Sequence, residues 1–285
     1  MVYVEISGGL GNQLYKYATG YALSKKKKCG LTLDTTIVDT VDFRSFELDG
    51  LQVKYDRRIT WKYQRGIWDR LIGNRIRKYA KIGHVTNIEE RCLNGECDYE
   101  AVHKALKASD IFLEGGWQSY KYFDNYRKDL ECMLVPSFEL QVHTQELLHQ
   151  IRNTNSVAIH VRRGDYVRLG CTLSNDYYES AVNKISQMIE NPIFFVFSED
   201  IAYCQLIFKE IPSEKVVYVR HHEKNDTIVD FYLMRNCKYH IIANSSYSWW
   251  AAYTNPFEHK IVFAPDGGST DPLRNNLYPE DWIVL

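Results

Sequence analysis

The second half of the chain alternates short apolar runs with helix-like segments, and this alternation restricts the fold more than any other feature of the sequence. The runs 193–197 and 239–242 are apolar on both faces, as strands of a parallel sheet covered by helices must be. Helix-like segments such as 177–189 and 228–235 lie between runs of this kind. From Ser156 onward the sequence therefore predicts a doubly wound α/β domain.

The first half begins in the same way and then changes character. Residues 2–6 predict a strand, and a glycine turn follows it. Residues 14–22 then place apolar side chains at spacings of three and four, which predicts a helix. Residues 110–118 predict another strand that ends in a glycine turn. Residues 57–84 are rich in arginine, lysine and aromatic side chains and indicate an irregular helical region.

Length and composition fit two globular domains. The 285 residues are 45% hydrophobic and 25% charged, which is enough to bury sizeable cores. We place the boundary between residues 136 and 156, so that the expected domains are residues 1–150 and 151–285. The formal net charge is −1, so nothing draws the whole surface toward nucleic acid.

The sequence lacks the features of membrane-spanning or secreted chains. No apolar window is long enough to cross a bilayer, and no basic leader precedes the first strand. The seven cysteines are scattered without a CxxC pair, which is typical of reduced thiols in the cytoplasm. The only basic run, Lys25–Lys28, either complements the dipole at a helix end, which we favour, or contacts an anionic membrane face. We expect a cytoplasmic protein with at most peripheral membrane contact.

A strand at the start of the second half runs into two adjacent arginines, Arg162 and Arg163. Because side chains alternate along a strand, His160 and Arg162 share one face. Ligands of α/β sheets bind at the carboxyl ends of strands, and guanidinium groups match phosphate oxygens two at a time. The segment therefore predicts a binding site for a phosphorylated ligand. The alternative is an ordinary strand end whose arginines pair with surface carboxylates.

The turn Gly8-Gly9-Leu10-Gly11-Asn12-Gln13 lies between a predicted strand and a predicted helix. Backbone amides and the helix dipole at such a place favour an anion or a polar sugar. Leu14 stands where the GxGxxG fingerprint needs its third glycine, and no Walker sequence occurs, which disfavours a nicotinamide enzyme or a P-loop kinase. The alternative is a tight turn with an Asn cap.

Four residues able to cap a helix follow the predicted strand 239–242, and these are Asn244, Ser245, Ser246 and Ser248. One cap is enough, so the surplus hydroxyls and the first amides of the helix can bind phosphate oxygens. Trp249 and Trp250 then offer a base or sugar a flat apolar surface. The alternative is a simple N-cap followed by a buried aromatic pair.

The chain has no DxD carboxylate pair that would chelate a metal together with a nucleotide. Arginines can stabilise the charge of a departing nucleoside diphosphate without one. We therefore expect a reaction that needs no metal and no other cofactor. Asp230, on the predicted helix 227–236, is a candidate for a ribose or guanine edge, although solvated helix acids are common.

The three motifs together resemble the bacterial α-1,2-fucosyltransferases of glycosyltransferase family 11. They are the turn at residues 8–13, the segment 160–166 and the segment 244–250, and the resemblance extends to their order and spacing. It covers nearly the whole chain and is weakest over residues 41–110. It implies an α/β, GT-B-like fold of two Rossmann-type domains that face a cleft, with residues 1–150 on the acceptor side and residues 151–285 binding GDP-fucose.

The resemblance also implies the reaction and the donor contacts. L-Fucose passes from GDP-β-L-fucose, with inversion, to the 2-hydroxyl of a terminal β-galactoside, on a free or lipid-linked oligosaccharide. The basic residues of such motifs act on the donor diphosphate, a role implied here for His160, Arg162 and Arg163. The remaining donor-binding residues implied are Gly11, Asn12, Asp230, Asn244, Ser245, Ser246 and Ser248.

The general base and the acceptor contacts are less sharply indicated. Arg162 is the first catalytic candidate, and Asp165 is a second that either accepts the proton of the acceptor hydroxyl or, as we favour, holds the arginines in place. Glu114 is a weaker candidate for the base. Sugars stack on aromatic faces, so Trp117 and Gln118 are acceptor-binding candidates, with a core tryptophan as the alternative.

Three rival functions remain open at this level. A fucosyltransferase of another linkage or acceptor fits the same phosphate-binding residues. So does a glycosyltransferase that uses another nucleotide sugar. A noncatalytic carbohydrate-binding protein explains the 21 tyrosines and six tryptophans but leaves the double arginine without a purpose. The resemblance places the protein in a bacterial cytoplasm, at or near the inner membrane, in the synthesis of surface polysaccharide such as O-antigen.

Overall fold

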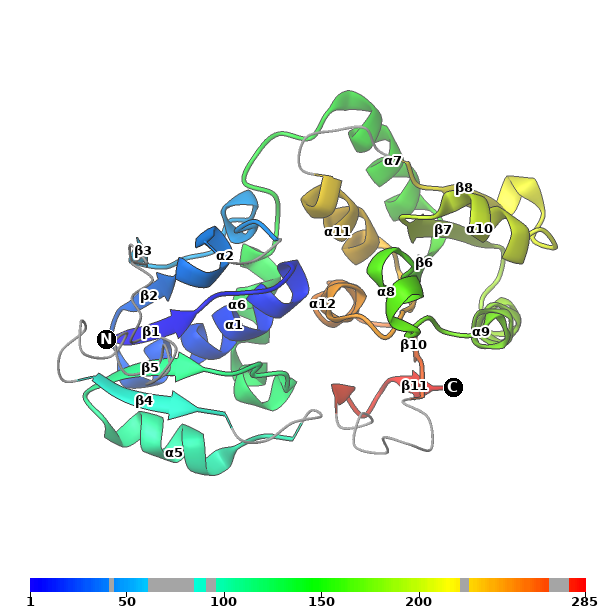
Figure 1. The fold of residues 1–285 in the computed structure, drawn as a ribbon. Helices are drawn as coiled ribbons and strands as arrows, with labels where there is room; N and C mark the ends of the chain where they lie inside the picture. The colour runs from blue at the N-terminus through cyan, green and yellow to red at the C-terminus, as the bar shows by residue number, and fades with distance from the viewer. Residues whose placement is uncertain (41–43, 61–84, 91–95, 221–225, 267–276) are drawn as a thin grey trace. The chain divides into compact units, whose positions relative to one another are not determined.

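A computed structural model describes residues 1–40, 44–60, 85–90, 96–220, 226–266 and 277–285. The chain forms two compact units, which are residues 1–48 with 53–128, and residues 49–52 with 129–285. The division falls earlier than the expected boundary at residues 150 and 151. The reason is α7 (Val142–Asn153), which contacts α11 (Asp226–Asn236) and β6 (Asn155–Val161) of the second unit. Figure 1 shows the elements of both units.

The first unit is a five-stranded parallel sheet in the order β3-β2-β1-β5-β4. Its strands are β1 (Val2–Glu5), β2 (Leu31–Asp34), β3 (Arg57–Ile59), β4 (Val85–Glu89) and β5 (Asp110–Glu114). Its principal helices are α1 (Leu10–Lys27), α2 (Thr36–Thr40) and α5 (Tyr99–Lys107). The strand β3 lies where an irregular helical region was expected, and residues 61–84 of that region lie outside the described residues.

The second unit is a six-stranded parallel sheet in the order β11-β10-β9-β6-β7-β8. Besides β6, its strands are β7 (Pro192–Ser198), β8 (Val216–Tyr218), β9 (Tyr239–Ile241), β10 (Val262–Ala264) and β11 (Ile283–Val284). Its further helices are α8 (Gly164–Leu169), α9 (Asn175–Met188), α10 (Ile201–Ile207) and α12 (Ser246–Tyr253). This is the doubly wound arrangement that the alternating pattern predicted. The helix α6 (Arg127–Met133) spans the point in the sequence where the two units divide.

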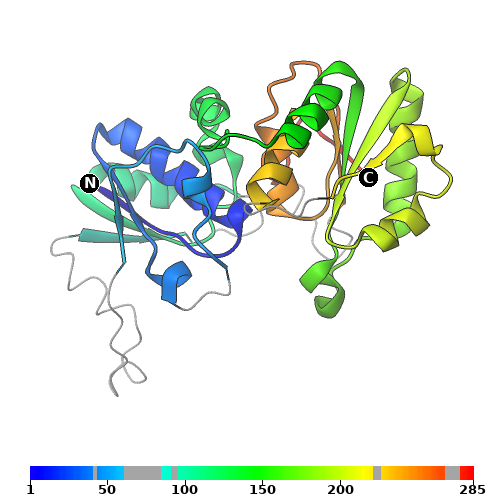
Figure 2. The ribbon, with the colours of Figure 1, turned by 90° about the horizontal axis from the view of Figure 1, so that it is seen from above.

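Helices cover both faces of the second sheet (Figure 2). Val157, Ile159 and Val161 of β6 belong to one apolar cluster with residues of α9, α10 and β7. His160, on the opposite face of the same strand, lies beside Tyr247 of α12, with ring centroids 5.6 Å apart. The alternation of β6 therefore separates an apolar core from the polar residues of a candidate site.

Candidate functional site

The strand order of the second unit reverses between β6 and β9. The chain winds from β6 to β7 and β8 in one direction, and from β9 to β10 and β11 in the other. Such a switch point is where doubly wound sheets bind ligands, outside the carboxyl ends of the strands. Arg162 and Arg163 follow β6 here, and Asn244 and Ser245 follow the adjacent β9. Two motifs far apart in the sequence thus meet at one edge.

A hydrogen bond joins the two motifs directly. His160 Nδ1 lies 2.8 Å from the hydroxyl of Ser248 on α12. Both side chains are buried, and the Ser248 hydroxyl also accepts a hydrogen bond from the main-chain N–H of Ala243 at 3.3 Å. Burial and the nearby charge of Arg162 lower the pKa of His160 to about 3. The buried His160 ring therefore favours the neutral form, and its contact with Ser248 connects β6 to α12.

Carboxylates hold the two arginines. Arg162 donates to Asp165 at 2.6 Å and to Glu199, and its guanidinium lies 5.3 Å from the Tyr166 ring centroid. Arg163 is 3.7 Å from the Tyr203 ring centroid and 3.4 Å from Asp200. Both arginine side chains remain about one-fifth exposed, at 21% and 22%. The guanidinium groups are thus oriented and still accessible to an anion.

Sequence reasoning missed Glu199 and Asp200, which follow β7. Glu199 also accepts a hydrogen bond from the main-chain N–H of Arg163 at 3.3 Å, and Asp200 caps α10 by accepting from Tyr203 N at 3.0 Å. The available signal was their place directly after the next apolar strand, because consecutive strands of a βαβ unit usually pair. Gly164 has φ +24°, and a Cβ there would lie 3.2 Å from Glu199, so the turn beside the arginines favours glycine.

The start of α12 provides the other side of this edge. Ser245 is the N-cap and accepts from Tyr247 N, and Asn244 donates to the carbonyl of Cys171 at 2.9 Å. Asn244, Ser245 and Ser246 are half-buried, so they can reach a ligand. Ser248 is fully buried, and its hydroxyl is engaged by His160.

The tryptophan pair does not form an open stacking surface. Trp249 is 3% exposed and Trp250 is fully buried, and they pack with Tyr253. The indole N–H of Trp249 donates to the carbonyl of Leu277 at 2.8 Å. The expectation that this pair offers a surface to a base or sugar was therefore wrong, and the alternative of a buried aromatic pair is correct. A helix with aromatic residues on several faces needs a core on several sides.

Asp230 lies half-buried on α11, one turn after Thr227. The Thr227 carbonyl accepts a hydrogen bond from the Tyr247 hydroxyl at 2.6 Å, and α11 packs along α12. Asp230 is therefore on a helix that packs against the second motif.

In the first unit, the glycine turn after β1 meets the turn after β5. Asn12 Oδ1 accepts a hydrogen bond from Gln118 Nε2 at 3.3 Å, although 106 positions separate them. Gly8 has φ +80°, and a Cβ there would lie 3.0 Å from Asn12 Nδ2, so the turn requires glycine. Gln118 is exposed and Asn12 is half-buried. Gly11 is buried in the first turn of α1.

Trp117 is a core residue. It is fully buried and packs edge-on against Tyr122, with ring centroids 5.1 Å apart. A direct contact of Trp117 with an acceptor is therefore wrong for this structure, and the alternative of a core tryptophan holds. Its φ of +54° is uncommon for a bulky residue and turns the chain so that Gln118 faces Asn12.

Glu90, after β4, holds this turn and was also missed. Its carboxylate accepts hydrogen bonds from the main-chain N–H of Trp117 and from the Tyr122 hydroxyl, the latter at 2.9 Å. Burial raises the pKa of Glu90, against the opposing effect of these hydrogen bonds. Glu114, the weaker candidate for a base, accepts from Asn87 Nδ2 at 3.2 Å.

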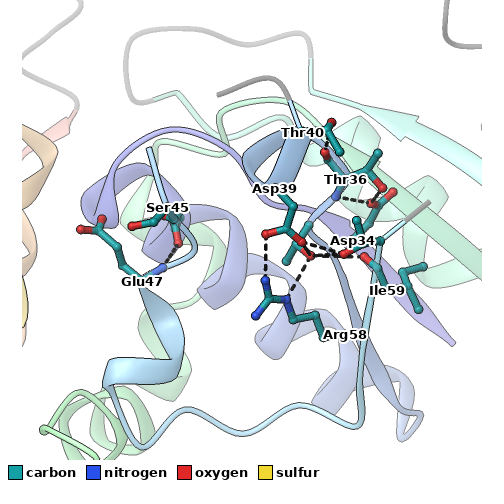
Figure 3. Close-up of polar contacts among 11 residues, drawn as sticks. Asp34, Thr36, Asp39, Thr40, Ser45, Glu47, Arg58 and Ile59 are labelled. Atoms are coloured by element: carbon teal, nitrogen blue, oxygen red, sulfur yellow. Dashed lines mark hydrogen bonds and ion pairs between the residues drawn. The ribbon is translucent and has the colours of Figure 1, made fainter. Parts of the chain in front are cut away.

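Polar contacts close the carboxyl ends of β2 and β3 (Figure 3). Arg58 pairs with Asp39 at 2.8 Å, and Asp34 accepts from Thr36 N at 2.9 Å. Burial of Asp39 is outweighed by hydrogen bonds from Thr35 and Thr60 and by the charge of Arg58, which together lower its pKa. Asp39 is thus engaged by Arg58, Thr35 and Thr60, which indicates a structural role for this part of the edge.

Gln13 is fully buried and ties two loops together. Its amide donates to the carbonyls of Gly8 and Ser45, both at 2.8 Å, and accepts from Glu47 N at 3.0 Å. Ser45 and Glu47 are drawn in Figure 3. The Gln13 side-chain amide therefore stabilises the turn through these hydrogen bonds.

A separate cavity of about 970 Å³ lies at the amino end of β7, at the other end of the strand from Glu199. Glu190, Pro192, Phe208 and Lys215 are among its lining residues, and the arginines are not. Within the described ranges, no group of three or more histidines, cysteines or carboxylates could hold a metal ion. The six cysteines in those ranges are free, and no helix there is long and apolar enough to cross a bilayer.

Comparisons with known proteins agree with this architecture. Residues 84–285 match the family model described as glycosyl transferase family 11. An Escherichia coli alpha-1,2-colitosyltransferase is 32% identical over 100% of this chain and 99% of its own length. The O-antigen biosynthesis glycosyltransferase WbnK of E. coli is 30% identical over the full length of both. The mouse galactoside 2-alpha-L-fucosyltransferase Sec1 is 25% identical over 98% of this chain and 68% of its own.

Among solved structures, the fucosyltransferase NodZ from Bradyrhizobium matches with a TM-score of 0.54 and 12% identity, over 88% of this chain and 92% of that one. The paired parallel sheets and this likeness define an α/β protein of the GT-B-like class. The chain belongs to glycosyltransferase family 11.

Proposed function

We propose that this protein is an inverting, metal-independent α-1,2-fucosyltransferase. It would move L-fucose from GDP-β-L-fucose to the 2-hydroxyl of a terminal β-galactoside. The observation that carries the proposal is the meeting of Arg162 and Arg163 with the start of α12 at the switch point of the second sheet. The mouse relative is named for the same transfer, and the colitosyltransferase for the same linkage.

In the proposed reaction the bond between fucose C1 and the β-phosphate oxygen breaks, and its electron pair leaves with GDP. Arg162 and Arg163 would stabilise the charge that develops on the diphosphate. The half-buried Asn244, Ser245 and Ser246 would bind phosphate or ribose oxygens.

The acceptor oxygen attacks C1 from the opposite face, which inverts the configuration, and its proton passes to a base or to water. Asp165 is engaged by Arg162 at 2.6 Å, which supports a role in holding the arginine. In the first unit, Asn12 and Gln118 would bind donor or acceptor hydroxyls, since they form a polar pair at a switch point. The acceptor would be a free or lipid-linked oligosaccharide of surface polysaccharide synthesis, as the name of WbnK suggests.

A second candidate differs only in the sugar of the donor. The colitosyltransferase relative is 32% identical along its whole length, so colitose is a serious alternative to fucose. Colitose is fucose without its 3-hydroxyl. A site built to hydrogen-bond a hydroxyl rejects the deoxy analogue by about 10⁴-fold or more, whereas a site built for the analogue discriminates weakly.

The test is incubation of the purified protein with GDP-fucose and a panel of β-galactosides in the presence of EDTA. GDP release is followed, and the product linkage is solved by NMR. We expect an α-1,2-fucosylated product whose formation is abolished by Arg162→Ala and unaffected by Arg168→Ala, at an exposed position on α8. Release of GDP only from the colitose donor would establish the second candidate. Another linkage, or dependence on a metal, would contradict the proposal.

A further inference from the structure

The adjoining C-terminal ends of α1 and α5 carry lysines that the proposed transfer does not use. Lys25, Lys26 and Lys27 form the last turn of α1, Lys28 caps it, and Lys107 ends α5. The two helices contact each other, and Lys27 joins them by donating to the carbonyls of Ala105 at 3.0 Å and Ala108 at 2.5 Å. Lys27 thus satisfies the free carbonyls at the end of α5.

The remaining lysines are directed to solvent. We define the lysine surface as Lys25, Lys26, Lys28 and Lys107, all of which are exposed. Lys25 lies 5.2 Å from the Tyr21 ring centroid, and the other three form no ion pair among the described residues. The carboxylate of Glu100 is engaged by Lys104 at 2.6 Å. Cations in the last turn complement a helix dipole, and here four exposed lysines lie at the ends of two helices that contact each other.

Lys28 places a charge at a position where glycine is the more usual residue. It is the C-cap of α1 with φ +50° and ψ +47°, in the left-handed region. Glycine is the usual residue there, because a side chain makes this conformation unfavourable.

Apolar side chains accompany the lysine surface on α5. Leu106 is 41% exposed and immediately precedes Lys107, and Tyr99 is 69% exposed on the same helix, seven positions earlier. Residues spaced by seven lie on one helical face. Basic side chains beside an exposed leucine are typical of surfaces that lie on a bilayer, where the apolar group enters the headgroup region. Nucleic acid requires charge alone and gives Leu106 no role.

We propose that the lysine surface, with Leu106, docks on an anionic lipid bilayer. It would hold the protein at the membrane where a lipid-linked acceptor resides, although docking itself does not rest on the proposed transferase activity. Each lysine near such a surface contributes about fivefold to partitioning, through an attraction that falls off within a Debye length.

The experiment is sedimentation of the full chain with phosphatidylcholine vesicles, with or without phosphatidylglycerol, at low and high ionic strength. We expect binding to the anionic vesicles alone, weakened by salt. Changing the four lysines together to Gln should lower the partition coefficient by about a hundredfold or more. The matched control changes four exposed lysines outside the lysine surface, Lys121, Lys128, Lys184 and Lys209, to Gln, and should retain binding.

Two further measurements separate the alternatives. Leu106→Ser keeps the charge and should reduce vesicle binding by about fivefold to tenfold, in line with the apolar area that enters the bilayer. Circular dichroism establishes that each variant is folded, and transfer to a soluble acceptor should be unchanged in all of them. The proposal is overturned if the wild type ignores anionic vesicles, if the control loses binding equally, or if Leu106→Ser has no effect while a DNA duplex binds as tightly.

Discussion

His160 and Ser248 are 88 positions apart in the sequence, and their side chains form a buried hydrogen bond of 2.8 Å. The bond connects the strand that leads into Arg162 with the first turn of α12. It therefore fixes the relative position of the two groups that we expect to hold the donor diphosphate. The geometry of the site depends on a pair of residues that does not itself reach the surface.

Ser248→Ala should lower the free energy of unfolding by about 1–3 kcal/mol, because it leaves the buried His160 nitrogen without a partner. The KM for the donor should rise, since α12 loses its anchor to β6. Urea unfolding and donor kinetics measure the two effects. In a double-mutant cycle with His160→Phe, the coupling should reach about 1 kcal/mol. Simple additivity would show that the bond is not what positions α12.

Glu199→Ala should reduce kcat/KM for the donor by about tenfold to a hundredfold, because Arg162 and the Arg163 main chain lose a common acceptor. Glu199→Gln keeps an oxygen acceptor and should retain most activity. The comparison is made by GDP release at varied donor concentration. Glu214→Ala, at an exposed position of the same unit, is the control. Equal losses in Glu199→Gln and Glu199→Ala would point to charge and not to orientation.

Gln118→Ala should alter kinetics more than stability. Its bond to Asn12 is 3.3 Å and exposed, so its loss should change the free energy of unfolding by less than about 0.5 kcal/mol. The KM for the acceptor should rise severalfold if Gln118 faces the galactoside. Initial rates at saturating donor measure this, with Gln145→Ala, exposed on α7, as the control. An unchanged acceptor KM would remove Gln118 from the acceptor site.

Acid should destabilise the fold below about pH 6.5. Burial lowers the pKa of His160 to about 3, with a contribution from Arg162, and that of His240 to about 3, with a contribution from Lys260. The unfolded chain binds these protons near pH 6.5, so stability is complete above that pH and falls as the pH drops toward 3. Each histidine should lower the free energy of unfolding by about 1.4 kcal/mol for each pH unit of this drop.

Urea unfolding of His160→Asn across the same pH range checks the assignment. The Asn side chain can still form a hydrogen bond with Ser248 but takes up no proton. The free energy of unfolding should therefore change less steeply with pH, by the contribution of one histidine. Gln145→Asn, at an exposed position on α7 that carries no titratable group, should leave the slope unchanged. A wild-type slope in His160→Asn would mean that His160 is protonated in the folded protein.

The sequence by itself determined the parallel sheets and the two motifs of the second sheet. Apolar periodicity reports burial, and residues directly after a strand must lie at its carboxyl end, so Arg162 and Asn244 could be assigned to one edge. The family resemblance rested on the same segments and is confirmed by the match over residues 84–285.

Only the tertiary structure decided which polar residues are open to a ligand. Ser248 and His160 form a hydrogen bond with each other, and Trp117 and Trp250 are core residues. Glu199 and Glu90 accept hydrogen bonds from main-chain N–H groups that follow the neighbouring strands. A side chain's exposure depends on what packs against it from elsewhere in the chain, and local spacing contains no information about that partner. The order of the strands, set by contacts between distant segments, therefore selected the site from the candidates.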